Sequence, residues 1–165
     1  MRQISGQDVL AWERYARQHG SKIKVEQLLA TWWLDDVFNR DGQSGVIGTS
    51  AMLKAVGACL ILEQSTQTTE QNQLLVANQV SIGGIRLRFE GHGQLIGQRP
   101  LLRFSFHTLV LSVGERTLFQ RNIPEPEPKR TPFFALIHLD QEQQCLAARG
   151  RGGGLAIWRQ GQEPA

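Results

Sequence analysis

Residues 85–90 read Ile-Arg-Leu-Arg-Phe-Glu, a strict alternation of apolar and charged side chains. Because successive side chains of a β-strand point to opposite faces, this stretch predicts a strand with one buried face and one face in water. The segment 101–113 has the same character over a greater length. Four of its apolar side chains are expected on one face: Leu102, Phe104, Phe106 and Val110.

Short strands are predicted on both sides of this pair. The runs that indicate them are 31–38, 58–63, 75–82, 116–123, 133–139, 145–149 and 155–159. Turn residues separate the runs, among them Gly91-His92-Gly93 and Gly114-Glu115, and the prolines that follow residue 123 predict an extended loop. No helical pattern interrupts the strands, which disfavours parallel βαβ units. We therefore expect an all-β, antiparallel, lipocalin-like barrel of about eight or nine strands.

The N-terminal region has a helical pattern instead. A helix is expected over residues 8–20, with Asp8 as its N-terminal cap and Gly20 as its stop. Trp12 would bury this helix against the barrel. A second, short helix is expected over residues 25–29.

These patterns divide the chain into three parts. Residues 1–27 form the helical segment, residues 28–160 the barrel domain, and residues 161–165 a frayed tail. Within the barrel domain, residues 51–56 are expected to begin as a helical turn, and the polar stretch 64–73 as a loop.

Composition limits the class of protein. The chain has 165 residues, a formal net charge of +3 and 41% hydrophobic residues, which excludes disorder as the main state. Two cysteines, Cys59 and Cys145, are too few for a disulfide scaffold or a multi-cysteine zinc site. The N-terminus lacks the apolar region of a secretory signal, and the longest apolar runs are too short to span a bilayer. A soluble, cytoplasmic protein is therefore expected.

Signatures of catalysis and metal binding are weak. The four histidines lack metal-ligand spacing, so neither a metal nor a cofactor is expected: His19, His92, His107 and His138. No nucleophile elbow is present, and the adjacent Asp35 and Asp36 point to opposite sides of a strand. Cys145 and His138 have nothing near them in the sequence that would activate a thiol. The sequence therefore favours a binding protein over an enzyme.

The run Arg-Gly-Arg-Gly-Gly-Gly at residues 149–154 is the most unusual stretch of the chain. A dinucleotide fingerprint would need a third glycine at Leu155 and a helix after the run. An RGG-type nucleic-acid segment would be longer and repeated, and no aromatic ladder alternates with the arginines, so nucleic acid is not an expected partner. The run is interpreted as a tight turn or bulge between two strands, with arginines on its rim.

Three short motifs resemble the plastid lipid-associated, or fibrillin, family. Leu-Leu-Ala-Thr-Trp-Trp-Leu at residues 28–34 resembles the family's Leu-x-Gly-x-Trp-x-Leu, with Ala30 in place of glycine. Residues 77–84 resemble its Val-x-Asn-x-Val region. Residues 149–158 resemble its closing Arg-Gly-Asp-x-Gly-x-Leu-Phe-Val strand, with Arg151 in place of the acid. The resemblance implies a lipocalin-like barrel that binds rather than catalyses, in a bacterial phototroph and peripheral to thylakoid membranes.

The barrel, its aromatic residues and this resemblance together predict a binding site for a lipophilic molecule such as a carotenoid, a quinone or another pigment or lipid. The residues expected to line it are Trp32, Phe89, Phe104, Phe106 and Phe134. Two alternatives stay open: an assembly factor for photosynthetic complexes whose barrel is filled by its own side chains, and a bilin lyase-like chromophore carrier. An empty apolar lumen would favour the binding protein, a filled one the assembly factor, and a lumen with a carboxylate the lyase.

A second expected site is a basic rim that faces an anionic membrane surface or an acidic protein. The Pro-rich loop and the glycine-rich turn are both connections between strands, and connections at one end of a barrel lie together. The basic residues expected to meet there are Lys129, Arg130, Arg149 and Arg151. Each would contribute about 1 kcal/mol near an anionic surface.

Overall fold

A computed structural model describes residues 3–44, 52, 55, 57–65 and 72–161. Most of the predicted turn at 51–56, most of the loop at 64–73 and most of the tail lie outside the described residues. The elements are α1 (Gly6–His19), α2 (Val25–Leu28), β1 (Ala30–Phe38), β2 (Cys59–Gln64), β3 (Gln73–Ile82), β4 (Ile85–Ile96), β5 (Leu101–Val113), β6 (Arg116–Asn122), the short 3₁₀ helix η1 (Pro128–Arg130), β7 (Phe133–Asp140), β8 (Cys145–Gly150) and β9 (Leu155–Gln160).

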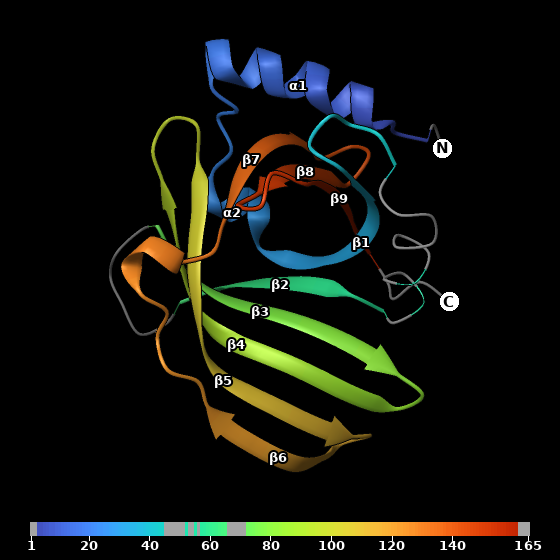
Figure 1. The fold of residues 1–165 in the computed structure, drawn as a ribbon, viewed down its shortest axis with the longest axis vertical. Helices are drawn as coiled ribbons and strands as arrows, with labels where there is room; N and C mark the ends of the chain where they lie inside the picture. Colours follow the sequence, from blue (N-terminus) through green and yellow to red (C-terminus); the bar gives the residue numbers. More distant parts are fainter. Residues whose placement is uncertain (1–2, 45–51, 53–54, 56, 66–71, 162–165) are drawn as a thin grey trace.

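The strands form a closed, barrel-like ring, which confirms the all-β, antiparallel prediction. Their order is β4-β3-β2-β1-β9-β8-β7-β5-β6, and an additional pairing of β4 with β5 closes eight of them into the ring (Figure 1). Every described strand pair is antiparallel. A closed ring leaves few exposed strand edges, which is why this many short strands can form a stable sheet.

Strand β5 is shared between the ring and an outward extension of the sheet. Its first residues, Leu101–Arg103, pair with β7 and close the ring. Its last residues, Thr108–Val113, pair instead with β6, which among the described strands pairs with β5 alone. We call residues 80–89 and 108–122 the extension; in Figure 1 it is the lower part of the sheet, where β3 to β6 continue past the ring.

Helix α2 and Trp32 fill one end of the ring. Trp32 is 1% exposed, and its indole Nε1 donates a 2.8 Å hydrogen bond to the carbonyl of Leu28, the last residue of α2. Their side chains belong to one core cluster with those of β2, β3 and β8, including Leu62, Leu74 and Leu146. This end of the ring is therefore packed with side chains.

Helix α1 lies across the outside of β7, β8 and β9 (Figure 1). Val9 is fully buried there, and Trp12 packs on the same cluster and stacks on the ring of His138 at 4.3 Å. The predicted role of Trp12 is confirmed. The cap differs from the prediction: Ser5 caps the helix, and Asp8 is the third helical residue of a capping box with it.

The predicted turn at Gly91-His92-Gly93 is wrong, because these residues lie inside β4. A Cβ at Gly91 would lie 1.8 Å from the carbonyl oxygen of Ser105 on β5. Glycine is needed here so that two backbones can approach each other at a bulge, rather than to reverse the chain.

Bulges also set side-chain directions in two strands, and the first of them reverses a prediction. The β4–β5 bulge places Val110 opposite Arg88, on the outer face rather than with Phe104 and Phe106. A bulge in β1 between Leu34 and Asp36 turns Phe38 outward, into the cluster beneath α1. One extra residue inverts the faces of everything that follows it, and the period-2 pattern cannot reveal the insertion.

Candidate functional site

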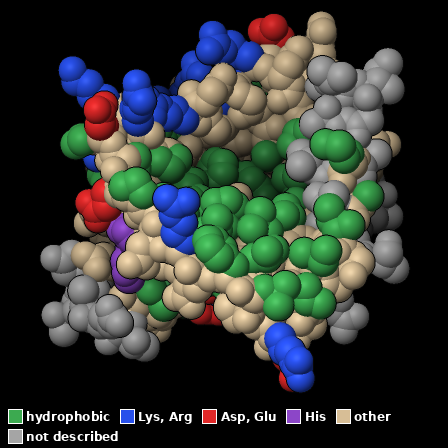
Figure 2. All heavy atoms as spheres, turned by 60° about the horizontal axis from the view of Figure 1, so that its bottom comes forward, with side chains coloured by type: hydrophobic (Ala, Val, Ile, Leu, Met, Phe, Trp, Pro, Cys, Tyr) green, Lys and Arg blue, Asp and Glu red, His purple; other side chains and the backbone are tan. Residues whose placement is uncertain are grey.

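The inner face of the extension is an exposed apolar surface. Strand register places one row of apolar residues side by side across four strands: Val80, Leu87, Leu111 and Phe119. The row beyond it contains Ile82, Ile85 and Val113, and Ile82 is 60% exposed. Figure 2, in which the lower edge of Figure 1 is turned forward, shows hydrophobic side chains gathered around a hollow on this side.

The opposite face of the extension is polar. Arg86, Arg88 and Glu90 alternate with the apolar residues of β4, and Ser112 lies across from Arg86. The alternation that predicted this strand is thus present, but its apolar side is only half covered. We call this apolar side, with the aromatic residues next to it, the mouth of the ring.

A chain of aromatic contacts leads from the mouth into the core. Ring centroids are 5.7 Å apart for Phe89 and Phe106, 5.4 Å for Phe106 and Phe104, and 5.3 Å for Phe104 and Phe134. Phe134 then meets Trp158 edge-on at 5.2 Å. Phe104 and Trp158 are buried, whereas Phe89 and Phe106 are half-buried, so the chain runs from a partly open end to a closed one. Tilted and edge-on pairs at these distances are the favourable aromatic arrangements.

Four of the five predicted lining residues therefore lie together. Trp32 is the exception, because it is sealed beneath α2 at the filled end. Trp158 belongs to the chain and was missed by the sequence analysis. The only signal for it was the strand pattern at 155–159, in which Leu155 and Ile157 pack under α1 while Trp158 points into the ring.

No protein-family model and no curated protein matches the chain. All three motifs noted in the sequence occupy well-defined places in the fold, and residues 77–84 form the end of β3 and its turn into β4. The Trp-Trp motif forms the start of β1, and the glycine-rich run forms the turn between β8 and β9. The site must therefore be interpreted from its own geometry.

Three of the four predicted rim residues come from neighbouring loops. The Arg151 guanidinium, in the β8–β9 turn, donates a hydrogen bond to the carbonyl of Lys129 in η1. Arg130 follows Lys129, is exposed, and its Nε lies 3.9 Å from a carboxylate oxygen of Glu127. We call these three residues, Lys129, Arg130 and Arg151, the basic loop pair, because they come from two neighbouring loops.

Neither helix in the described part of the chain has the length and apolar character needed to cross a bilayer.

Arg149 has a structural position rather than a place on the rim. Its Nε and Nη2 each lie 2.7 Å from a carboxylate oxygen of Glu13 on α1, and the two side chains are 17% and 12% exposed. Its Nη1 donates to the carbonyls of Arg40 and Gly153. Arg149 therefore ties together α1, the loop after β1 and the β8–β9 turn. Its hydrogen bonds lower the pKa of Glu13 below its ordinary value, against the opposing effect of burial.

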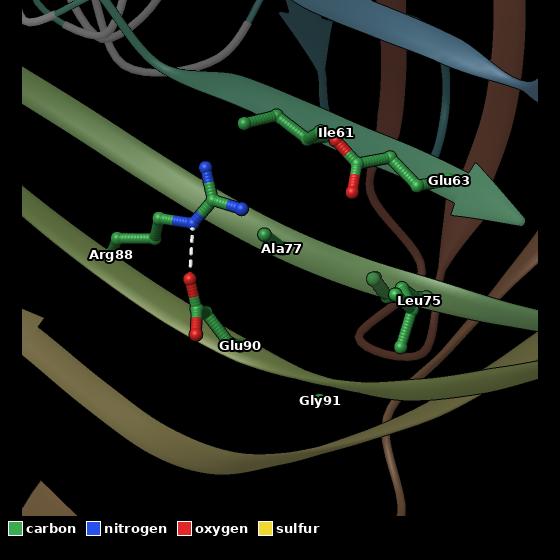
Figure 3. A pocket seen from close by; sticks show the side chains of 8 residues that line it. Ile61, Glu63, Leu75, Ala77, Arg88, Glu90 and Gly91 are labelled. Atoms are coloured by element: carbon green, nitrogen blue, oxygen red, sulfur yellow. Dashed lines mark ion pairs between the residues drawn. The ribbon is translucent and has the colours of Figure 1, made fainter. Parts of the chain in front are cut away.

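A small hollow of about 250 Å³ lies on the outer face of β2, β3 and β4. Figure 3 shows the guanidinium of Arg88 above Ala77, between the carboxylates of Glu63 and Glu90. Arg88 Nε lies 2.6 Å from Glu90 Oε1. These carboxylates are outside the ring, whereas a chromophore lyase would need its acid in the lumen.

Burial shifts the pKa values of two potentially reactive side chains, Cys145 and His138. Burial raises the pKa of the Cys145 thiol to about 11, so this cysteine stays protonated near neutral pH. Burial also lowers the pKa of His138, whose ring stacks on Trp12. Among residues 3–44, 57–65 and 72–161, no group of three or more His, Cys, Asp or Glu is arranged to hold a metal ion.

Proposed function

We propose that this chain is a non-catalytic, fibrillin-like and lipocalin-like protein that binds a lipophilic molecule, such as a carotenoid, a quinone or another pigment or lipid, near photosynthetic membranes. One observation carries the proposal: the exposed apolar face of the extension is continuous with the aromatic chain from Phe89 to Trp158. Exposed apolar patches of this kind are typical of ligand or interaction sites. The motif resemblance supports the choice of ligand class.

The shape of the ring limits how such a ligand would lie. The end beneath α2 is filled, so a ring-shaped head group would enter only as far as Phe104 and Phe106. The rest of the molecule would cover exposed side chains of the extension such as Ile85 and Phe119. Each Å² of apolar surface removed from water contributes about 25 cal/mol, and stacking on the aromatic rings adds to this.

The test is titration of the whole chain with decyl-plastoquinone, in which binding is measured by the quenching of tryptophan fluorescence. Replacing Phe89 and Phe106 together by serine is expected to weaken binding at least tenfold, because both rings offer exposed apolar area at the mouth. Val110→Ser is the matched control, since Val110 lies on the same strand as Phe106 but on the outer face. Equal dissociation constants for wild type and the double variant would contradict the proposal.

We further propose that the basic loop pair holds the protein at an anionic membrane. Three cations near such a surface contribute about 3 kcal/mol together, so changing Lys129, Arg130 and Arg151 to Gln should weaken co-sedimentation with phosphatidylglycerol vesicles on the order of a hundredfold. Binding of the wild type should also fall steeply with salt, because exposed charges are screened over about 8 Å at physiological ionic strength.

A control variant that loses the same charge elsewhere separates location from net charge. Arg14, Lys22 and Lys24 are exposed side chains of the N-terminal segment, and their change to Gln removes the same three charges. If both triple variants lose binding equally, a general charge effect is responsible and the basic loop pair is not the docking site.

The second candidate function is the assembly factor. The filled end of the ring and the exposure of every residue of β6 favour it, since an exposed strand edge beside apolar residues such as Leu118 can dock another protein. A chain that binds no lipophilic probe, yet loses a protein partner on Leu118→Ser and Phe119→Ser, would support this function instead. The lyase alternative gains nothing from Glu63 and Glu90, which lie outside the ring.

A further inference from the structure

A separate groove lies between α1 and the ring, away from the mouth. Its volume is about 370 Å³, within the roughly 300–1,000 Å³ of small-molecule sites. The groove has an apolar lining contributed by α1, β5 and β7: Ala16, Leu101, Ala135, Leu136 and Ile137. None of these residues belongs to the aromatic chain.

Arginines line this groove in excess over acids. Arg17, Arg99 and Arg149 face a single carboxylate, that of Glu13. Glu13 is already occupied by Arg149 at 2.7 Å and lies 3.3 Å from Arg17. Counting these four side chains, the groove carries a formal charge of +3 − 1 = +2.

Arg99 is the arginine left without an acid. Within the part of the chain that the structure describes, its exposed side chain enters no hydrogen bond or ion pair. Arg17, Arg99 and Leu101 also line an adjoining hollow beside the end of α1, so the two arginines lie where the hollows join. A charged group at this junction would have open access to water, with the apolar lining beside it.

We propose that this groove binds a single-chain amphiphile with a carboxylate head, of the fatty-acid class. The carboxylate pairs with Arg99 and Arg17, because a guanidinium presents paired donors to a carboxylate. The alkyl chain lies along Ala16, Leu101, Ala135 and Ile137. A neutral lipid would leave Arg99 unpaired, and a cation would be repelled by the net positive charge.

Occupancy would join α1 to the ring. The groove is walled by Ala16 and Arg17 from the helix and by Leu101, Ala135 and Ile137 from the strands, so a bound chain contacts both. Ligand that binds only when α1 is docked must stabilise the docked state. The ligand is thus expected to raise the midpoint of thermal unfolding as well as to bind.

The probe is dodecanoate, below its micellar concentration, titrated calorimetrically into the whole chain. We expect Arg99→Gln to weaken dodecanoate binding at least tenfold and to leave the weaker binding of dodecanol unchanged. Arg103→Gln is the matched control, because Arg103 is another exposed arginine of the β5 region that does not line the groove. Ala135→Phe, which fills the apolar lining, should also reduce dodecanoate affinity.

The mouth variants separate this site from the proposed function. Binding of dodecanoate should survive the Phe89→Ser, Phe106→Ser change, whatever that change does to decyl-plastoquinone. Three results would overturn the proposal: no binding of dodecanoate by the wild type, equal affinity of wild type and Arg99→Gln, or loss of dodecanoate binding in the mouth variant alone.

Discussion

Trp32→Ala is expected to lower the free energy of unfolding by about 3–5 kcal/mol, the usual cost of truncating a fully buried tryptophan. The indole fills the end of the ring beneath α2 and is 1% exposed, so its removal leaves a cavity that the surrounding strands cannot close. Urea unfolding followed by far-UV circular dichroism measures the change.

Trp32→Phe separates packing from hydrogen bonding at the same position. Phenylalanine keeps most of the volume but leaves the Leu28 carbonyl without its indole donor, which costs about 1–3 kcal/mol when the carbonyl stays buried. If Trp32 were a ligand contact in an open lumen instead, Trp32→Ala would weaken ligand binding while leaving stability nearly unchanged. That result would show that this end of the ring is not filled.

Arg149→Gln is expected to cost about 3 kcal/mol, the lower end for breaking a buried ion pair, because both partners keep a little exposure. The variant leaves the partly buried Glu13 carboxylate with only the more exposed Arg17 beside it, and it removes the donors to the Arg40 and Gly153 carbonyls. Since α1 is tied to the ring here, its docking should weaken first. Hydrogen exchange of the α1 amides measures this local loss.

The same pair predicts how stability depends on pH. The pKa of Glu13 is lower in the folded chain than in the unfolded one, because Arg149 donates to its carboxylate. The stabilisation is therefore complete above the unfolded pKa, about 4.3, and is lost as pH falls through the lower folded value. Wild type should lose this part of its stability on acidification, and Arg149→Gln, in which Arg17 is the remaining cation beside Glu13, should lose less of it.

A matched variant isolates the ion pair. Glu13→Gln combined with Arg149→Gln removes both charges, so it should be more stable than Arg149→Gln alone, which leaves the Glu13 carboxylate with only Arg17 beside it. If the free energy of unfolding of Arg149→Gln falls as steeply at low pH as that of the wild type, other carboxylates, not Glu13, produce the fall.

Several strands could be predicted closely from the sequence because their apolar positions repeat every second residue. The segment 101–113 coincides with β5, and the hairpin at Gly114 is where it was expected. The predictions that failed depend on how closely two backbones approach each other, which the sequence pattern does not show. Gly91 resembles a turn residue in the sequence, and only the closeness of the β5 backbone, which would put an added Cβ 1.8 Å from the Ser105 carbonyl oxygen, explains it as a strand glycine.

The residues of the candidate site also divide into those that the sequence could predict and those that it could not. Phe89, Phe104, Phe106 and Phe134 could be proposed together because each is an apolar residue on a predicted strand, and their contacts agree with that grouping. Trp32 could not be separated from them, because the position of α2 over the ring is a long-range packing event. Trp158 was missed because both faces of β9 are buried, which removes the alternation that would have marked its direction.

By itself, the sequence determined the antiparallel strands, the N-terminal helix and the small net charge, since these follow from local periodicity and composition. Tertiary structure alone decided the rest. Bulges set which side chains face inward, and ring closure left the apolar face of the extension exposed. The docking of α1 places Glu13 beside Arg149, so Arg149 forms an ion pair instead of lying on the basic rim. These outcomes depend on contacts between residues far apart in the chain, as in the 136-residue separation of that pair, and no local pattern encodes them.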